Sequence, residues 1–214
     1  MILKILKHFF KIEKNLIGSA ILFSLLYGFL YSFFWLDSLS LKGFALLTWI
    51  NILFALFLIS PDIYAPDLAD GSLDFLFSQK LSVLNLFCAK IIFIFLGYFI
   101  PILGSAILNG IFFNQDLATI IHVILGPLIL APAIILLIHT GSLLTLNSAA
   151  SGFLMPILMI PFFIPIFIFG ISISIKLQEN FPSSPLILGA FGMDIFYGIL
   201  GIIFSKFLME EHFR

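Results

Sequence analysis

Three carboxylates lie within eight positions of the stretch DLADGSLDFLF, which runs from Asp67 to Phe77. Only 10% of the residues in the chain are charged, so this density of aspartate is unusual. Carboxylates at such spacing could bind a metal ion, cap a helix or meet basic groups of another protein. A calcium loop places its ligands at fixed positions, and the four aspartates from Asp62 to Asp74 do not follow that spacing. A helix cap and a contact with another protein remain as interpretations of these aspartates.

The residues after Asp70 are typical of the start of a helix. Gly71 and Ser72 follow it directly, and a Ser or Asp side chain can accept hydrogen bonds from free backbone N–H groups. Four apolar residues then recur at helical spacing: Leu73, Leu76, Phe77 and Leu81. The pattern predicts a short amphipathic helix along a membrane surface. Such a helix could only anchor a loop or could bind another protein, and the residues leave both open.

Asp194 is the one charged residue within the apolar run 180–205. An intramembrane acid indicates either a functional group beside a partner or water path, or a protonated acid that bonds a neighbouring helix. An intramembrane aspartyl protease would need a second facing aspartate, and no other apolar run carries an acid. The chain also has no H-E-x-x-H motif for a zinc protease. We therefore do not predict an enzyme.

The composition places the chain in a membrane. Hydrophobic residues make up 62% of it, 28 residues are Phe, and the mean hydropathy is +1.23. A soluble domain of this size could not bury so much apolar surface. The net charge of −1 leaves no basic excess for nucleic acid. The single cysteine, Cys88, excludes an internal disulfide, and no Cys/His spacing predicts a metal site.

The uncharged runs predict an all-α integral membrane protein that forms a single transmembrane domain over residues 1–214. About 20 helical residues cross a hydrocarbon core of about 30 Å, and a lipid-exposed helix satisfies its own backbone. Six transmembrane helices follow, at about 15–36, 43–61, 91–113, 118–144, 153–175 and 185–206. The segment 62–90 between the second and third spans carries the amphipathic helix.

The distribution of Lys and Arg predicts the orientation. With six spans both termini share one side, and eight of the ten basic residues lie on it. Only Lys42 and Lys176 fall on the other side. Because basic residues concentrate on the cytoplasmic side, we expect both termini in the cytoplasm.

Three prolines interrupt the fifth predicted span: Pro156, Pro161 and Pro165. Each removes an N–H donor, so together they should kink or partly unwind the helix and provide a hinge. Transmembrane helices also tolerate proline as a passive feature. We interpret Pro101, Pro127 and Pro132, which occur singly or as one pair, in that passive sense.

The run DGSLDFLFSQKLSVLNLFCAK, residues 70–90, resembles the cytoplasmic segment after the second span in ABC-2-type exporter permeases. Within that superfamily the chain most resembles the CcmB family, the membrane permeases of the haem exporter for cytochrome c maturation. The form D-L-x-D-G-S-L-D/E-x-L and the proline-rich MPILMIPFFIPIFIFG at 155–170 carry the resemblance.

The resemblance implies that the segment after the second span couples the permease to a separate cytoplasmic ABC ATPase. The coupling residues would be Asp67, Asp70, Gly71, Ser72, Leu73, Asp74, Leu76, Phe77 and Lys90. The chain has no G-x-x-x-x-G-K-[ST] motif, so ATP would be bound by that partner. In such a complex ATP hydrolysis would drive release of a haem-loaded chaperone.

The same resemblance implies the remaining partners and the location. They are a second membrane protein that handles haem, a small accessory protein of the complex and, indirectly, the haem chaperone, in the bacterial inner membrane. Six spans are half of a typical exporter, so we expect a homodimer or an equivalent partner with six spans. Haem is the possible substrate, and we assign no bound cofactor, metal or haem ligand to this chain. Export of another amphiphile, such as a lipid-linked sugar or drug, and a scaffold without transport remain alternatives.

Overall fold

Apolar helices account for most of the chain in its computed structural model. The structure describes residues 6, 9–11, 13–34, 40–71, 83–146, 151–179 and 184–212, and no strand occurs among them. The long helices are α2 (Lys14–Phe34), α3 (Leu41–Ile59), α10 (Ser151–Gln178) and α11 (Ser184–His212). The shorter ones are η1 (Ser60–Asp62), α4 (Ala65–Ala69), α6 (Val83–Ile94), α7 (Ile100–Phe112), α8 (Leu117–Ile129) and α9 (Ala131–Leu144). A π-helical turn, η2 (Phe95–Phe99), joins α6 to α7.

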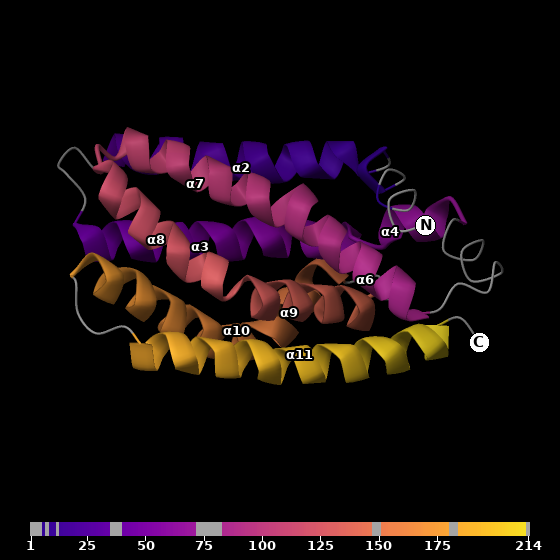
Figure 1. Cartoon of the computed structure of the whole chain (residues 1–214). Helices are drawn as coiled ribbons and strands as arrows, with labels where there is room; N and C mark the ends of the chain where they lie inside the picture. The colour runs from indigo at the N-terminus through magenta and orange to yellow at the C-terminus, as the bar shows by residue number, and fades with distance from the viewer. Residues whose placement is uncertain are drawn as a thin grey trace.

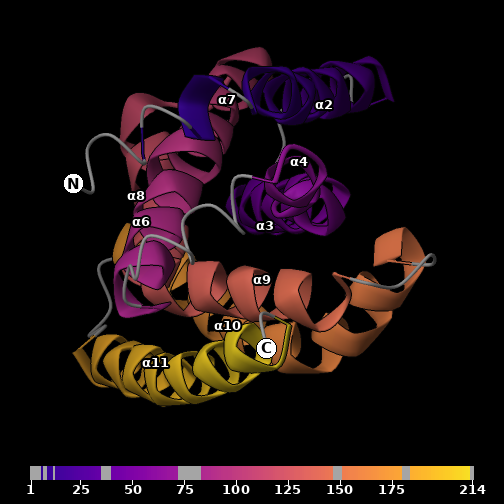
Figure 2. The same cartoon turned by 90° about the vertical axis from the view of Figure 1, so that its right-hand side faces the viewer.

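The helices lie lengthwise along a common direction, with α4 at one end of the bundle (Figure 1). We call this end the α4 end. Viewed along the bundle, α9, α10 and α11 form one group, α2 and α7 another, and α3 lies between them (Figure 2). Within the described ranges, five helical stretches are long and apolar enough to cross a membrane, and the number rises to six if the bent pair α8 and α9 is one span. The structure is therefore that of a helical membrane protein.

The fourth apolar stretch is bent by 52° where α8 meets α9. Leu130 separates the two helices, Pro127 lies inside α8, and Pro132 is the second residue of α9. Pro132 therefore lies at a break of the helix, which differs from the passive role expected of it, whereas Pro127 is accommodated inside α8 as expected. Pro132 has no N–H to donate and its ring hinders a continuous helix, so the backbone breaks beside it.

The proline-rich stretch is by contrast one uninterrupted helix. α10 runs from Ser151 to Gln178 with three prolines inside it. Of the two outcomes expected for this span, a kink or partial unwinding, the continuous helix excludes the unwinding, and the hinge stays a prediction. Leaving the helix in an apolar environment would expose further backbone groups without hydrogen-bond partners, which costs more than the missing N–H donors.

Glycines allow the central helices to approach each other closely. A Cβ built on Gly170 of α10 would overlap the ring of Trp49, which is fully buried on α3. A Cβ on Gly126 of α8 would lie 2.6 Å from the carbonyl oxygen of Gly170. Gly170 therefore packs against both α3 and α8 at once.

Replacing Gly170 with Ala should lower the stability of the fold. Overpacking a closely packed interior costs about 1–3 kcal/mol, because the Trp49 ring is enclosed and must shift. Gly192→Ala is the matched control, since a Cβ at Gly192 of α11 meets nothing within 4 Å. Thermal unfolding in detergent should show a lower midpoint for Gly170→Ala only. Equal midpoints for the two variants would contradict the close packing at Gly170.

Candidate functional site

A fully buried lysine is the centre of the polar site at the α4 end. The Nζ atom of Lys90 lies 2.6 Å from Oε1 of Glu13 and 2.6 Å from Oδ2 of Asp67. All three side chains are 0% exposed. Charged side chains are almost never fully buried unless they are paired, because their desolvation is costly. The two carboxylates compensate the ammonium group in the interior.

Aromatic residues complete the surroundings of Lys90. The Tyr98 hydroxyl donates a hydrogen bond to Oε2 of Glu13. The Lys90 Nζ also lies 4.2 Å from the ring centroid of Phe9, 5.0 Å from that of Tyr64 and 5.4 Å from that of Phe93. A cation at these distances is attracted to the ring faces. We call Glu13, Asp67, Lys90 and Tyr98 the Lys90 cluster.

The Lys90 cluster joins parts of the chain that are distant in sequence. Glu13 immediately precedes α2, Asp67 lies in α4, Lys90 in α6 and Tyr98 in the π-helical turn η2. Asp67 precedes the segment 70–82 and Lys90 follows it. The ion pairs therefore hold α4, which precedes the segment, to α6, which follows it, and both to the residue before α2.

A second buried group adjoins the cluster through Tyr64. The Tyr64 hydroxyl lies 2.5 Å from Nε2 of His139 in α9, and Nδ1 of His139 lies 3.1 Å from the Ser205 hydroxyl in α11. The Phe87 ring of α6 packs edge-on against the imidazole, with 5.0 Å between ring centroids. Both ring nitrogens of His139 are hydrogen-bonded, so the imidazole connects helices and is not available as a free ligand.

The structure places only part of the predicted coupling residues. Asp67 and Lys90 are buried in the Lys90 cluster and do not lie on an open surface. Asp70 terminates α4, with its N–H 3.1 Å from the Pro66 carbonyl oxygen, and Gly71 follows with a φ of 70°. This left-handed conformation suits a glycine at a helix end. The remaining coupling residues, Ser72, Leu73, Asp74, Leu76 and Phe77, and the predicted amphipathic helix lie outside the described residues.

Asp194 contacts the backbone at the bend of the fourth span. Its Oδ1 accepts a hydrogen bond of 3.0 Å from the Ala133 N–H near the start of α9. In a continuous helix that N–H would donate to the Ile129 carbonyl oxygen four residues earlier. Asp194 therefore supplies, from α11, the acceptor that the break removes. This contact joins α11 to the beginning of α9, and whether Asp194 also has a functional role stays a prediction.

Polar residues also connect helices at the end opposite α4. His122 Nδ1 of α8 lies 2.7 Å from Gln178 Oε1 of α10, and Gln178 Nε2 donates to the Thr119 hydroxyl at 2.8 Å. Asp116 caps α8 by accepting hydrogen bonds from the Thr119 hydroxyl and N–H, at 2.5 and 3.2 Å. These hydrogen bonds lower the pKa of Asp116. Among the described residues, no three His, Cys, Asp or Glu side chains form a metal-binding group.

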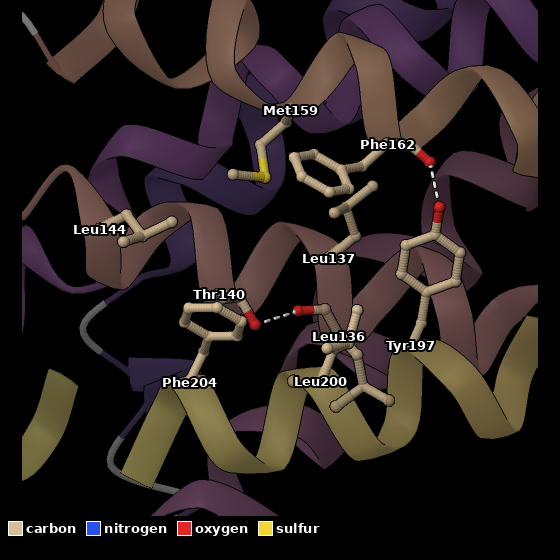
Figure 3. Close-up of a pocket in the computed structure, with 10 residues that line it drawn as sticks. Leu136, Leu137, Thr140, Leu144, Met159, Phe162, Tyr197, Leu200 and Phe204 are labelled. Atoms are coloured by element: carbon tan, nitrogen blue, oxygen red, sulfur yellow. Dashed lines mark hydrogen bonds between the residues drawn. The ribbon is translucent and has the colours of Figure 1, made fainter. Parts of the chain in front are cut away.

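Two apolar cavities adjoin α9 and α11. A cavity of about 200 Å³ lies between α9, α10 and α11 (Figure 3). Its two hydroxyl groups already donate to backbone carbonyl oxygens, Tyr197 to Phe162 at 2.5 Å and Thr140 to Leu136 at 2.8 Å. A larger cavity of about 590 Å³ lies beside the bend and is lined by residues of α6, α8, α9 and α11, among them Cys88 and Pro132.

In the Lys90 cluster and the group around His139, sequence reasoning missed Glu13, Tyr64, Tyr98 and Ser205. Glu13 lies three positions before the apolar run that begins at Leu16, and Lys90 lies directly before another, and this placement was the available signal. Glu13 and Lys90 are 77 positions apart, so the sequence alone could not show that they form an ion pair.

The long apolar helices are those of a multi-pass membrane protein. The model of the family described as CcmB protein matches residues 5–197, and the chain therefore belongs to the CcmB family. It is also similar to the heme exporter protein B of Bradyrhizobium diazoefficiens, with 32% identity over 137 residues. That match covers 64% of this chain and 61% of the relative, so it spans about three fifths of the relative's length.

Proposed function

We propose that the chain is the permease of an ABC-type complex that handles haem during the biogenesis of c-type cytochromes. Membership of the CcmB family carries this proposal, and the similarity to a heme exporter protein B supports haem as the substrate. The chain contributes the membrane helices, and a separate ATPase binds ATP. Hydrolysis there drives release of the haem-loaded chaperone.

The buried ion pairs support the coupling part of the proposal. A segment that receives force from an ATPase must be fixed to the transmembrane helices, since a loose loop would move without moving them. Asp67 and Lys90 flank the segment 70–82 and are joined 2.6 Å apart in the interior. Through Glu13 the same lysine holds the start of α2. A displacement of the segment is therefore passed to α2 and α6 together.

The assembly and orientation complete the proposal. Both termini and the segment 70–82 face the cytoplasm of a bacterium, where the ATPase docks, and the helices lie in its inner membrane. Two copies of the chain form the transport unit. The haem-handling membrane protein and the small accessory protein of the complex accompany them.

Deletion of the gene tests the proposed function. Haem-stained gels should lose the bands of c-type cytochromes in the deletion strain, and expression of the intact chain should restore them. Haem proteins of the b type, which bind haem without covalent attachment, are the control and should persist. Co-purification should recover an ATPase with the tagged chain. Normal c-type cytochromes in the deletion strain would instead favour export of another amphiphile or a scaffold.

A further inference from the structure

The two halves of the bent fourth span belong to different packed units. The outer unit consists of α8 and the second half of α10. Gly126 contacts Gly170, and the Ser174 hydroxyl donates to the Val123 carbonyl oxygen at 3.0 Å. Gln178 continues this contact through its hydrogen bond to Thr119. Three successive turns of α8 are thus fixed to α10.

The inner unit consists of α9, most of α11 and the first half of α10. The beginning of α11 also contacts the outer unit, because a Cβ built on Gly189 would lie 2.6 Å from the Phe169 ring of α10. α11 holds α9 near its start, where Asp194 accepts from the Ala133 N–H, and further along, where Ser205 meets His139. On the other side, a Cβ built on Gly141 of α9 would lie 2.8 Å from side-chain atoms of both Met155 and Met159 of α10. The second half of the broken span therefore has its own set of partners.

Three stretches of backbone connect the units: the bend between α8 and α9, the middle of α10, and the segment that leads from α10 to α11. The first two contain prolines that make them easier to bend. The first is the bend of 52° at Leu130, beside Pro132. The second is α10, in which Pro161 and Pro165 lie between the residues that contact α9 and those that contact α8. Neither proline can donate a helical hydrogen bond, which makes this part of α10 easier to bend. The bend at Leu130 and the middle of α10 can therefore both flex between the two units.

The larger apolar cavity leaves room for movement beside the bend. It has a volume of about 590 Å³ and is lined by Leu128, Ala131 and Pro132 of the bend, with residues of α6 and α11. Its lining residues Ile92, Leu128 and Ile202 are exposed, so the cavity opens to the surface of the bundle. The bend therefore has no closely packed neighbour on this side that would resist its movement.

We propose that Leu130–Pro132 and Pro161–Pro165 together form a hinge, on which the inner unit of α9 and α11 turns against the outer unit of α8. In this arrangement Asp194 is a positioning residue that keeps α9 attached to α11 during the movement. The inference rests on the proposed function for its driving force, which is the binding of ATP by the partner ATPase. The geometry of the two units is independent of that function.

Distances between spin labels test the hinge in the complex with its ATPase. In a Cys88→Ser background, cysteines replace exposed residues in three pairs: Ile121 with Phe207, Leu144 with Phe207, and Ile121 with Ile168. The first pair spans the hinge, and the other two lie within the inner and the outer unit. Pulsed EPR should show a shift for the first pair between the nucleotide-free and ATP-bound complexes, while the two control pairs keep their distances. Equal changes in all three pairs, or none, would overturn the proposal.

A variant without the three hinge prolines gives a second measurement of the distance in the first pair. Pro132→Ala, Pro161→Ala and Pro165→Ala together restore three N–H donors, and the shift of the first pair should disappear. Persistence of the shift would show that the movement occurs elsewhere.

If no ATPase binds the chain, the proposed function fails, and the first pair is then measured in lipid bilayers without it. There the wild-type distance distribution should be broader than that of the triple variant, and equal widths would overturn the hinge.

The role of Asp194 is tested by two further substitutions in the same labelled chain. Asp194→Asn keeps an oxygen that can accept from the Ala133 N–H, whereas Asp194→Leu does not. With the inner pair, Leu144 and Phe207, the Leu variant should broaden the distance distribution, and the Asn variant should restore the wild-type width. If the Leu variant matched the wild type, Asp194 would not hold the two helices together.

Discussion

Replacing Lys90 with Met should destabilise the protein by about 3–5 kcal/mol, because the change leaves two buried carboxylates without their cation. Met has a similar length, so the cost comes from the charge and not from a cavity. Glu13 and Asp67 are both 0% exposed, and water cannot compensate them. The expected observation is a large fall in the thermal unfolding midpoint in detergent.

Two controls separate the charge effect from a general effect of the substitution. Lys14→Met removes an exposed lysine at the same end of the bundle and should change stability by less than about 0.5 kcal/mol. The triple variant Glu13→Gln, Asp67→Asn, Lys90→Met removes all three charges and should recover part of the loss, because no uncompensated charge stays buried. If Lys90→Met were as stable as Lys14→Met, the ion pairs would not contribute to the stability of the fold.

The helical character of the chain could be predicted from its sequence, because lipid exposure requires long uncharged runs. The start of the third helix could not. From the sequence we expect this span to begin at residue 91, after Lys90, since a charge normally marks the end of a span. The structure continues the helix back to Val83, because Glu13 and Asp67 compensate Lys90 inside the protein.

The position of the bend was equally hidden from the sequence. Three prolines in the fifth span gave the stronger local signal, yet that helix is continuous and the break lies beside Pro132. What stabilises the break is a carboxylate that lies 61 positions away in α11. A local sequence pattern shows where a proline lacks a backbone N–H donor. It does not show which distant side chain accepts the hydrogen bond that a backbone carbonyl would otherwise accept.

Reversing the charge of the segment 70–82 should separate the permease from its ATPase. Asp70→Lys with Asp74→Lys would repel the basic groups that the proposed docking surface meets, while membrane insertion, which depends on the apolar helices, should persist. Leu76→Asp acts differently, since it places an unpaired charge in an apolar contact, at a cost of about 2–5 kcal/mol if that contact is fully buried. Both variants should reach the membrane at normal levels, lose the co-purifying ATPase and fail to mature c-type cytochromes.

The coupling variants differ from Lys90→Met in what they leave intact. They change residues beyond the buried ion pairs, so the thermal unfolding midpoint should stay near that of the wild type while assembly is lost. Lys206→Glu is the matched control, because it reverses an exposed charge near the end of α11 without touching the segment. It should keep both the ATPase and the cytochromes. If the Asp70/Asp74 and Leu76 variants also kept both, the segment would only anchor a loop at the membrane surface, and force from an ATPase would have to enter the helices elsewhere.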